Sequence, residues 1–124
     1  MFRAPARLAQ VLDVVLVLVF VLIGRVSHKE DLGIVGVLTT LWPFLVGLVV
    51  GHIVTFAWRR PFAVVRTGLG VWAATVVIGM LLRLASGQGV EPGFVIVTTI
   101  VLAVFLLGWR AVASAVARRR RVRG

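Results

Sequence analysis

The chain has 124 residues, of which 60% are hydrophobic, and its mean hydropathy is +1.09. A composition this apolar leaves too little polar surface to cover a soluble globule, so a separate soluble catalytic module is excluded. The formal net charge is +10. Because the basic residues flank apolar runs, membrane orientation and anionic headgroups explain this charge more simply than nucleic acid does. The absence of cysteine excludes disulfides, thiolate metal sites and a cysteine nucleophile.

Four apolar runs, separated by short charged links, follow one another along the chain. Each is close to the ~20 residues that a helix needs to cross ~30 Å of hydrocarbon. We therefore predict an all-α, polytopic integral membrane protein, with four transmembrane helices in one small bundle that occupies residues 1–124. The predicted spans are about 8–24, 34–57, 67–83 and 93–110, followed by a basic cytoplasmic tail at 111–124.

The basic residues fall unevenly on the two sides of this bundle. One side holds Arg25, Lys29 and Arg83, and the other holds the remaining 11 of the 14 basic residues. These are Arg3, Arg7, Arg59, Arg60, Arg66, Arg110, Arg118, Arg119, Arg120, Arg121 and Arg123. Because basic residues stay in the cytoplasm, both termini are predicted to be cytoplasmic, in a bacterial inner membrane.

The first span contains Asp13, the only carboxylate inside a predicted span. An ionisable group at that depth costs about 2.5–3.5 kcal/mol, so Asp13 should face the bundle and find a polar partner. His52 in the second span and Arg110 at the end of the fourth lie nearest its depth. Two interpretations stay open: an ion or proton site, or a structural ion pair that fixes helix packing.

The links on the side with few basic residues hold a second group of polar residues. Arg25 and Arg83 end the first and third spans there, and together they could attract an anion. Interfacial anchoring is the simpler explanation of both arginines. His28 lies in the first of these links, where a solvated loop residue is the usual role and a pH sensor the alternative.

The second span carries two features that bear on helix packing. Pro43, directly after Trp42, removes one backbone hydrogen bond and predicts a kink. Farther along, Gly47 and Gly51 form a stripe of small residues that lets another helix approach closely. The stripe predicts a close contact either inside the bundle or between two copies in a homodimer.

Beyond the fourth span, the cluster Arg118, Arg119, Arg120 and Arg121 favours the anionic headgroups of the inner leaflet. Docking of a cytoplasmic partner is the alternative. No catalytic residues can be assigned, because no Ser/His/Asp set, paired carboxylates or phosphate-binding glycine loop is present. His28 and His52 lie on opposite sides of the predicted bundle, so no metal site is predicted. No cofactor, no nucleic-acid partner and no enzyme activity are expected.

A series of short motifs resembles a family of small bacterial and archaeal membrane proteins, domain of unknown function three thousand and fifty-four. The motifs are Asp13 with 17–20, 23–25, Ser27-His28, 42–44, Arg60-Pro61, Thr67-Gly68, Val71-Trp72, Thr75-Val76, Gly79-Met80, Leu82-Arg83 and 108–110. The resemblance covers nearly the whole chain. It implies four spans with the same basic inner side, and it implies no substrate.

The sequence leaves two functions open. One is a small transporter or channel subunit, in which Asp13 couples to an ion or proton. The other is a structural or accessory membrane protein that binds a partner complex. A hydrated cavity at Asp13 that reaches one surface would favour transport, whereas a fully paired Asp13 would favour the structural function.

Overall fold

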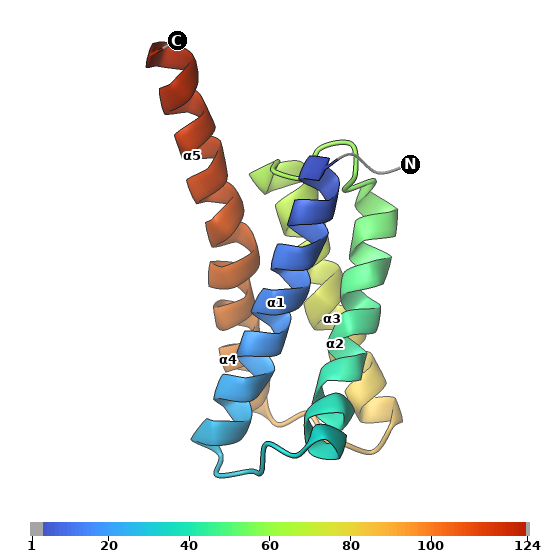
Figure 1. Cartoon of the computed structure of the whole chain (residues 1–124). Coiled ribbons are helices and arrows are strands. Elements are labelled where there is room, and N and C mark those ends of the chain that lie inside the picture. The colour runs from blue at the N-terminus through green and yellow to red at the C-terminus, as the bar shows by residue number, and fades with distance from the viewer. Residues whose placement is uncertain (1–3, 124) are drawn as a thin grey trace.

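Four long helices run up and down the computed structural model, which describes residues 4–123 (Figure 1). In chain order the elements are α1 (Ala4–Ser27), α2 (Ile34–Thr55), the π-helical turn η1 (Val64–Gly68), α3 (Leu69–Ala85), α4 (Pro92–Leu102), the π-helical turn η2 (Ala103–Leu107) and α5 (Gly108–Arg123). η1 continues into α3, and α4, η2 and α5 form one continuous helix. All four helices are long and apolar enough to cross a membrane. The predicted fold, a small four-span membrane protein, is confirmed.

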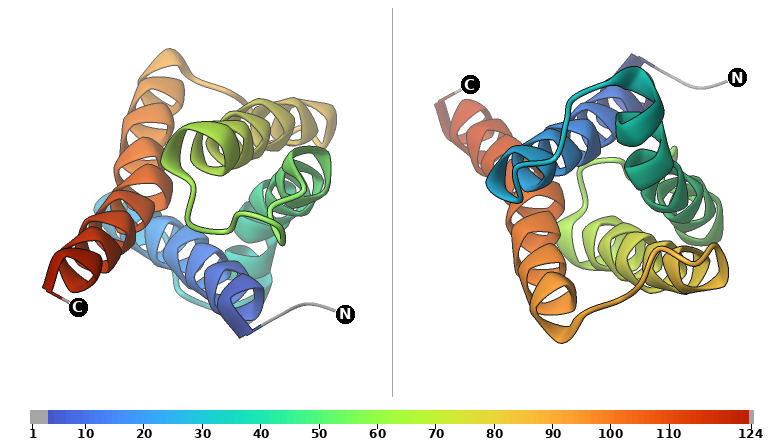
Figure 2. Two further views of the ribbon diagram at one scale, coloured as in Figure 1. Left: turned by 90° about the horizontal axis from the view of Figure 1, so that it is seen from above. Right: turned by 90° about the horizontal axis from the view of Figure 1, so that it is seen from below.

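The helices stand around the bundle in chain order, as the two end views show (Figure 2). α1 packs against α2, α2 against α3 and α3 against α4, and the helix of α4 and η2 closes back on α1. The most extensive of these contacts lies between α2 and α3. This order follows from the short links, since a short connection makes consecutive helices antiparallel neighbours.

The ends of the helices follow local backbone chemistry. α2 is capped by Phe56, which follows Thr55, has left-handed backbone angles and donates its N–H to the carbonyls of His52 and Ile53. α4 begins with Pro92, whose fixed φ and missing N–H suit a first helical turn. The link between α3 and α4 turns at Gly87 and Gly89, where φ is +78° and +84°. Glycine adopts such angles without steric cost.

The helices differ from the predicted spans mainly at their ends. α2 stops at Thr55, short of the predicted boundary at 57. The fourth helix runs unbroken through the predicted tail as far as Arg123. The two π-helical turns were not predicted. They contact each other, and η2 ends directly before the Gly108–Arg110 segment that supplies part of the site.

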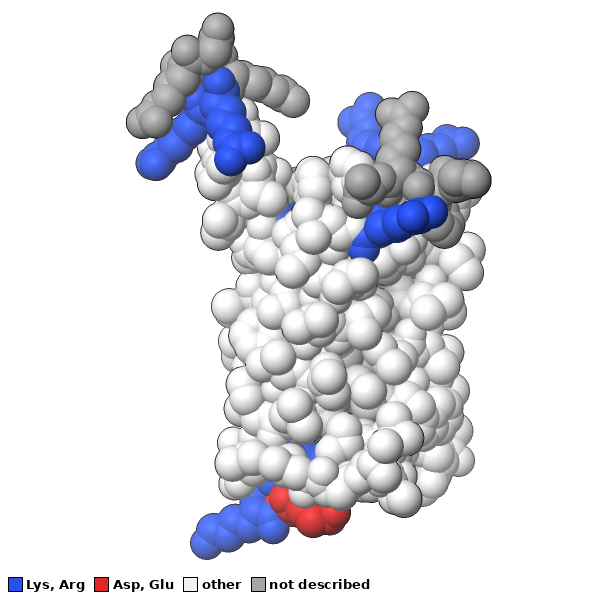
Figure 3. Space-filling model, viewed as in Figure 1, with Lys and Arg blue, Asp and Glu red and all other residues white. Residues whose placement is uncertain are grey.

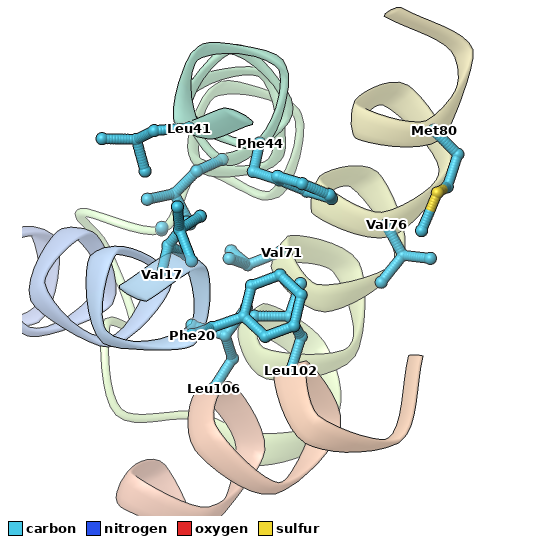
Figure 4. Close-up of a cluster of buried hydrophobic side chains, with 12 residues drawn as sticks. Val17, Phe20, Leu41, Phe44, Val71, Val76, Met80, Leu102 and Leu106 are labelled. Atoms are coloured by element: carbon cyan, nitrogen blue, oxygen red, sulfur yellow. The ribbon is translucent and has the colours of Figure 1, made fainter. Parts of the chain in front are cut away.

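The centre of the bundle is filled by interlocking aliphatic and aromatic side chains from all four helices (Figure 4). Phe44 of α2 is fully buried and meets Phe20 of α1 edge to face, with ring centroids 5.6 Å apart. It also lies against Gly79, where a Cβ would come within 2.5 Å of the Phe44 ring. Such packing, rather than a hydrophobic driving force, holds helices together in lipid.

On the face that Figure 3 shows, charged side chains gather at the two ends of the bundle and the surface between them is almost free of charge. We call the end with exposed Arg7, Arg59, Arg60, Arg66, Arg118, Arg119 and Arg120 the arginine end. Arg3 lies outside the described residues, as do the side chains of Arg121 and Arg123. The opposite end carries Arg25, Lys29 and Arg83 together with Glu30, Asp31 and Glu91.

Candidate functional site

Asp13 is the centre of a buried polar cluster near the arginine end. Its side chain is 0% exposed. Arg110 binds it with both terminal nitrogens, Nη1 lying 2.9 Å from Oδ1 and Nη2 2.6 Å from Oδ2. Trp109 Nε1 donates to Oδ1 at 2.8 Å, and His52 Nε2 lies 2.7 Å from Oδ2. The expectation that Asp13 points into the bundle toward His52 and Arg110 is confirmed.

These four contacts occupy the full acceptor capacity of the carboxylate. Two oxygens offer about four lone-pair positions, and each oxygen here faces two nitrogen atoms. The N–H groups of arginine and tryptophan can only donate. An ionised Asp13 that also accepts a bond from His52 Nε2–H therefore accounts for all four distances.

Arg110 ties this carboxylate to the rest of the arginine end. Arg110 as a whole is 0% exposed, so its N–H groups must find partners within the protein. Nε donates to the carbonyl of Pro61 at 2.9 Å, and Nη1 also donates to the carbonyl of Leu106 at 2.9 Å. Pro61 belongs to the link between the second and third spans. Arg110 thus connects α1, this link and its own helix.

The same link is fastened to the fourth helix by two further contacts. Phe62 meets Trp109 edge to face, with ring centroids 5.6 Å apart. Ser114 donates its hydroxyl to the carbonyl of Phe62 at 3.1 Å. The site therefore unites α1, α2, the second link and the fourth helix.

Trp109 and the carbonyl of Pro61 were not predicted as site residues. The sequence indicates Trp109 only as a span-end indole, which normally lies in the headgroup zone. Its position next to Arg110 in the chain was the signal that could have identified it. Backbone carbonyls such as that of Pro61 carry no sequence signal at all.

Among the described residues, no hydrogen bond or ion pair joins Arg25, His28 and Arg83, the second predicted group, to one another. Arg25 and Arg83 both lie near the charge of Glu30. Arg25 lies 3.0 Å from Glu30 and 3.1 Å from Asp31, and it also donates to Thr40. Its charge is therefore paired within the chain and is not open to an external anion. His28 is exposed.

Arg83 and Asp31 have partners of their own at this end. Arg83 donates to Gln88 at 3.0 Å and lies over the ring of Phe94, 4.4 Å from its centroid. The backbone N–H of Gly33 donates to the Asp31 carboxylate. This bond, with Arg25 nearby, holds the pKa of Asp31 below its usual value.

The glycine stripe of α2 packs inside the chain. A Cβ at Gly47 would come within 2.9 Å of the Ala74 carbonyl oxygen, and one at Gly51 within 2.9 Å of the Val71 Cα. Of the two predicted contacts, the one inside the bundle is therefore present. The stripe faces α3, so it is not free to form a homodimer.

Trp42 and Pro43, which precede the glycine stripe in α2, differ in burial. Pro43 is fully buried, in agreement with a packing role. Trp42 remains 40% exposed, so its predicted packing role is only partly met. With Val35, Leu38 and Leu45 it lines an open apolar groove of about 470 Å³ on the outer surface of α2.

No group of three or more His, Asp or Glu side chains within residues 4–123 is placed to hold a metal ion. The buried cluster can instead hold a charge, link helices and resist the separation of α1 from the fourth helix. In an apolar surrounding, hydrogen bonds to ionised groups are about twice as strong as neutral ones.

Comparison with known proteins agrees with the motifs noted above. No curated protein and no solved structure matches the chain. The family described as "Protein of unknown function (DUF3054)" matches residues 10–113, a segment that contains all four residues of the Asp13 cluster. The match covers most of the sequence, and the chain belongs to this uncharacterised family.

Proposed function

We propose that the protein is a structural or accessory component of the bacterial inner membrane, with both termini in the cytoplasm. The Asp13 cluster would then hold the four spans in one arrangement. The observation that carries this proposal is the saturation of the Asp13 carboxylate, which has four nitrogen partners from its own chain and no exposed surface.

A transport function would require Asp13 to exchange these partners for an ion, a proton or water during the transport cycle. A group that carries an ion or a proton needs a free acceptor position in contact with one membrane surface. Intramembrane acids with that role line a water-filled cavity or a proton relay. Asp13 instead forms a bidentate ion pair with Arg110, a geometry that favours fixed orientation over exchange. This favours the structural function over the transporter or channel subunit.

The test is a flux assay in liposomes with wild type and Asp13→Asn. An imposed pH gradient and preloaded cationic dye report proton and organic-cation movement. We expect both proteins to give the rate of protein-free liposomes, and Asp13→Asn to unfold at a lower temperature in detergent. Glu91→Gln is the control, because Glu91 is exposed and makes no side-chain cap hydrogen bond. It should match wild type in both measurements.

One outcome would overturn the proposal. If wild type conducts protons or dye, and Asp13→Asn abolishes the flux while its circular dichroism and elution volume stay unchanged, Asp13 is a transport residue. The transporter interpretation would then replace the structural one.

A further inference from the structure

The arginine end carries positive charge that the chain itself does not neutralise. Its exposed arginines come from α1, the second link, η1 and α5. Of the four acids in the sequence, Asp13 is buried against Arg110, and Glu30, Asp31 and Glu91 lie at the opposite end. There three acids face three basic residues. An external anion must therefore balance the arginine end.

The link that carries Arg59 and Arg60 is held in place relative to α5. The backbone of this link is fixed, because the carbonyls of Arg60, Pro61 and Phe62 accept bonds at 2.6, 2.9 and 3.1 Å. Two of the donors, Arg110 and Ser114, belong to the N-terminal part of α5. Arg59 is also ordered, with its guanidinium 5.2 Å from the centroid of the Phe56 ring. A surface ordered in advance loses less entropy on binding.

Exposed apolar side chains lie next to these arginines along the chain. Leu8 follows Arg7 and is 53% exposed, and Leu69 lies one turn after Arg66 and is 42% exposed. On α5, Val112 and Val116 are exposed one turn apart, directly before the Arg118–Arg120 cluster. The surface thus offers guanidinium groups beside apolar contacts.

From these observations we infer that the arginine end is a preformed binding surface for anionic phospholipids. The guanidinium groups pair with the headgroup phosphates, and the acyl chains cover the neighbouring leucine and valine side chains. Arginine forms bidentate hydrogen bonds with phosphate. A soluble acidic macromolecule would match the charge but would leave Val112 and Val116, which lie beyond the predicted fourth span, without an apolar partner. This inference does not depend on the role of Asp13.

Native mass spectrometry of the full chain in detergent can test the inference. Phosphatidylglycerol and phosphatidylcholine with the same acyl chains are titrated separately, and the lipid-bound fractions are compared. We expect wild type to bind phosphatidylglycerol more tightly. Raising ammonium acetate from about 0.05 to about 0.5 M should weaken this binding, because salt screens exposed charges.

Substitutions then locate the surface. One arginine near an anionic membrane surface is worth about 1 kcal/mol, which corresponds to roughly a fivefold change in binding constant. The triple variant Arg118→Gln/Arg119→Gln/Arg120→Gln should therefore lose the preference for phosphatidylglycerol. Two single variants, one at each end, are then compared. Arg66→Gln should weaken the binding of phosphatidylglycerol, and Lys29→Gln at the opposite end should not.

Three results would overturn the inference. Equal binding of the two lipids by wild type would show that no anionic headgroup site exists. An unchanged preference in the triple variant and in Arg66→Gln would place the site elsewhere. Displacement of bound phosphatidylglycerol by an acidic peptide at equal concentration would identify a soluble partner as the occupant.

Discussion

Charged side chains inside a transmembrane bundle are stable only when donors or counter-charges surround them. Asp13 and Arg110 illustrate this at the scale of single residues, because each is fully buried and each neutralises the other. Removal of one partner leaves the other charge unpaired in an apolar surrounding. Loss of one partner from a buried pair typically costs about 3–5 kcal/mol, whereas replacement of both by apolar residues can be nearly neutral.

We therefore predict strong non-additivity between these two positions. Asp13→Leu and Arg110→Met should each lower the free energy of unfolding in detergent by about 3–5 kcal/mol. The double variant should lose less than either single variant, since no charge is then left unpaired. Simple addition of the two losses would contradict the ion-pair interpretation.

A neutral bond between helices provides the comparison for this pair. Trp72 Nε1 donates to the carbonyl of Thr99 at 3.0 Å, joining α3 to α4. Hydrogen bonds between membrane helices average about 0.6 kcal/mol. Trp72→Phe should accordingly cost much less than either single change in the buried pair.

Much of this site follows from the sequence, because depth in a membrane is readable from distance to a span end. Asp13, His52 and Arg110 were placed together on that ground alone. The direction in which a side chain points around its helix cannot be read from the distance to a span end. Trp109 and the link around Pro61 join the site through tertiary packing, and the pairing of Arg25 with Glu30 and Asp31 depends on how one short link folds back.

At the scale of helices, the glycines divide into two groups with different neighbours. Gly47, Gly51 and Gly79 each face another element at a distance too short for a Cβ. Gly108, at the start of α5, would have nothing within 4 Å of an added Cβ. The first group allows close helix approach, whereas Gly108 lacks such a role within the chain.

Because of this difference, replacement of glycine by alanine should have opposite effects on the melting temperature at the two kinds of position. Gly47→Ala should lower the melting temperature in detergent, because the new methyl group meets the backbone of α3. Gly108→Ala should raise it slightly, since alanine is favoured over glycine in a helix by about 1 kcal/mol. Thermal unfolding of both variants in one detergent is the measurement. Equal melting temperatures would contradict the packing of α2 on α3.

Spans and small-residue stripes are properties of composition and spacing, so the helices and their number could be predicted. The partner of the Gly47–Gly51 stripe could not, because the same stripe suits a helix of its own chain or of a second copy. The π-helical turns η1 and η2 also leave no recognisable pattern. They contact each other where the third and fourth helices meet.

At the scale of the whole molecule, the uneven charge of the two ends predicts the orientation of the bundle. Cysteines introduced at exposed Ser27 and Ser86 should react with an impermeant thiol reagent added to intact spheroplasts. A cysteine at exposed Ala117 should not react, because the arginine end is expected to face the cytoplasm. The native chain contains no cysteine to interfere. Labelling at Ala117 alone would reverse the orientation.

The ion pair between Asp13 and Arg110 has a consequence for biosynthesis. The two residues are 97 positions apart, and the chain is made from its N-terminus. The first span must enter the bilayer with its acid unneutralised, and the counter-ion arrives only with the last span. Any product that ends before residue 110 lacks the arginine that neutralises this acid. The finished chain therefore differs from every product that ends before Arg110 in the charge left inside the membrane.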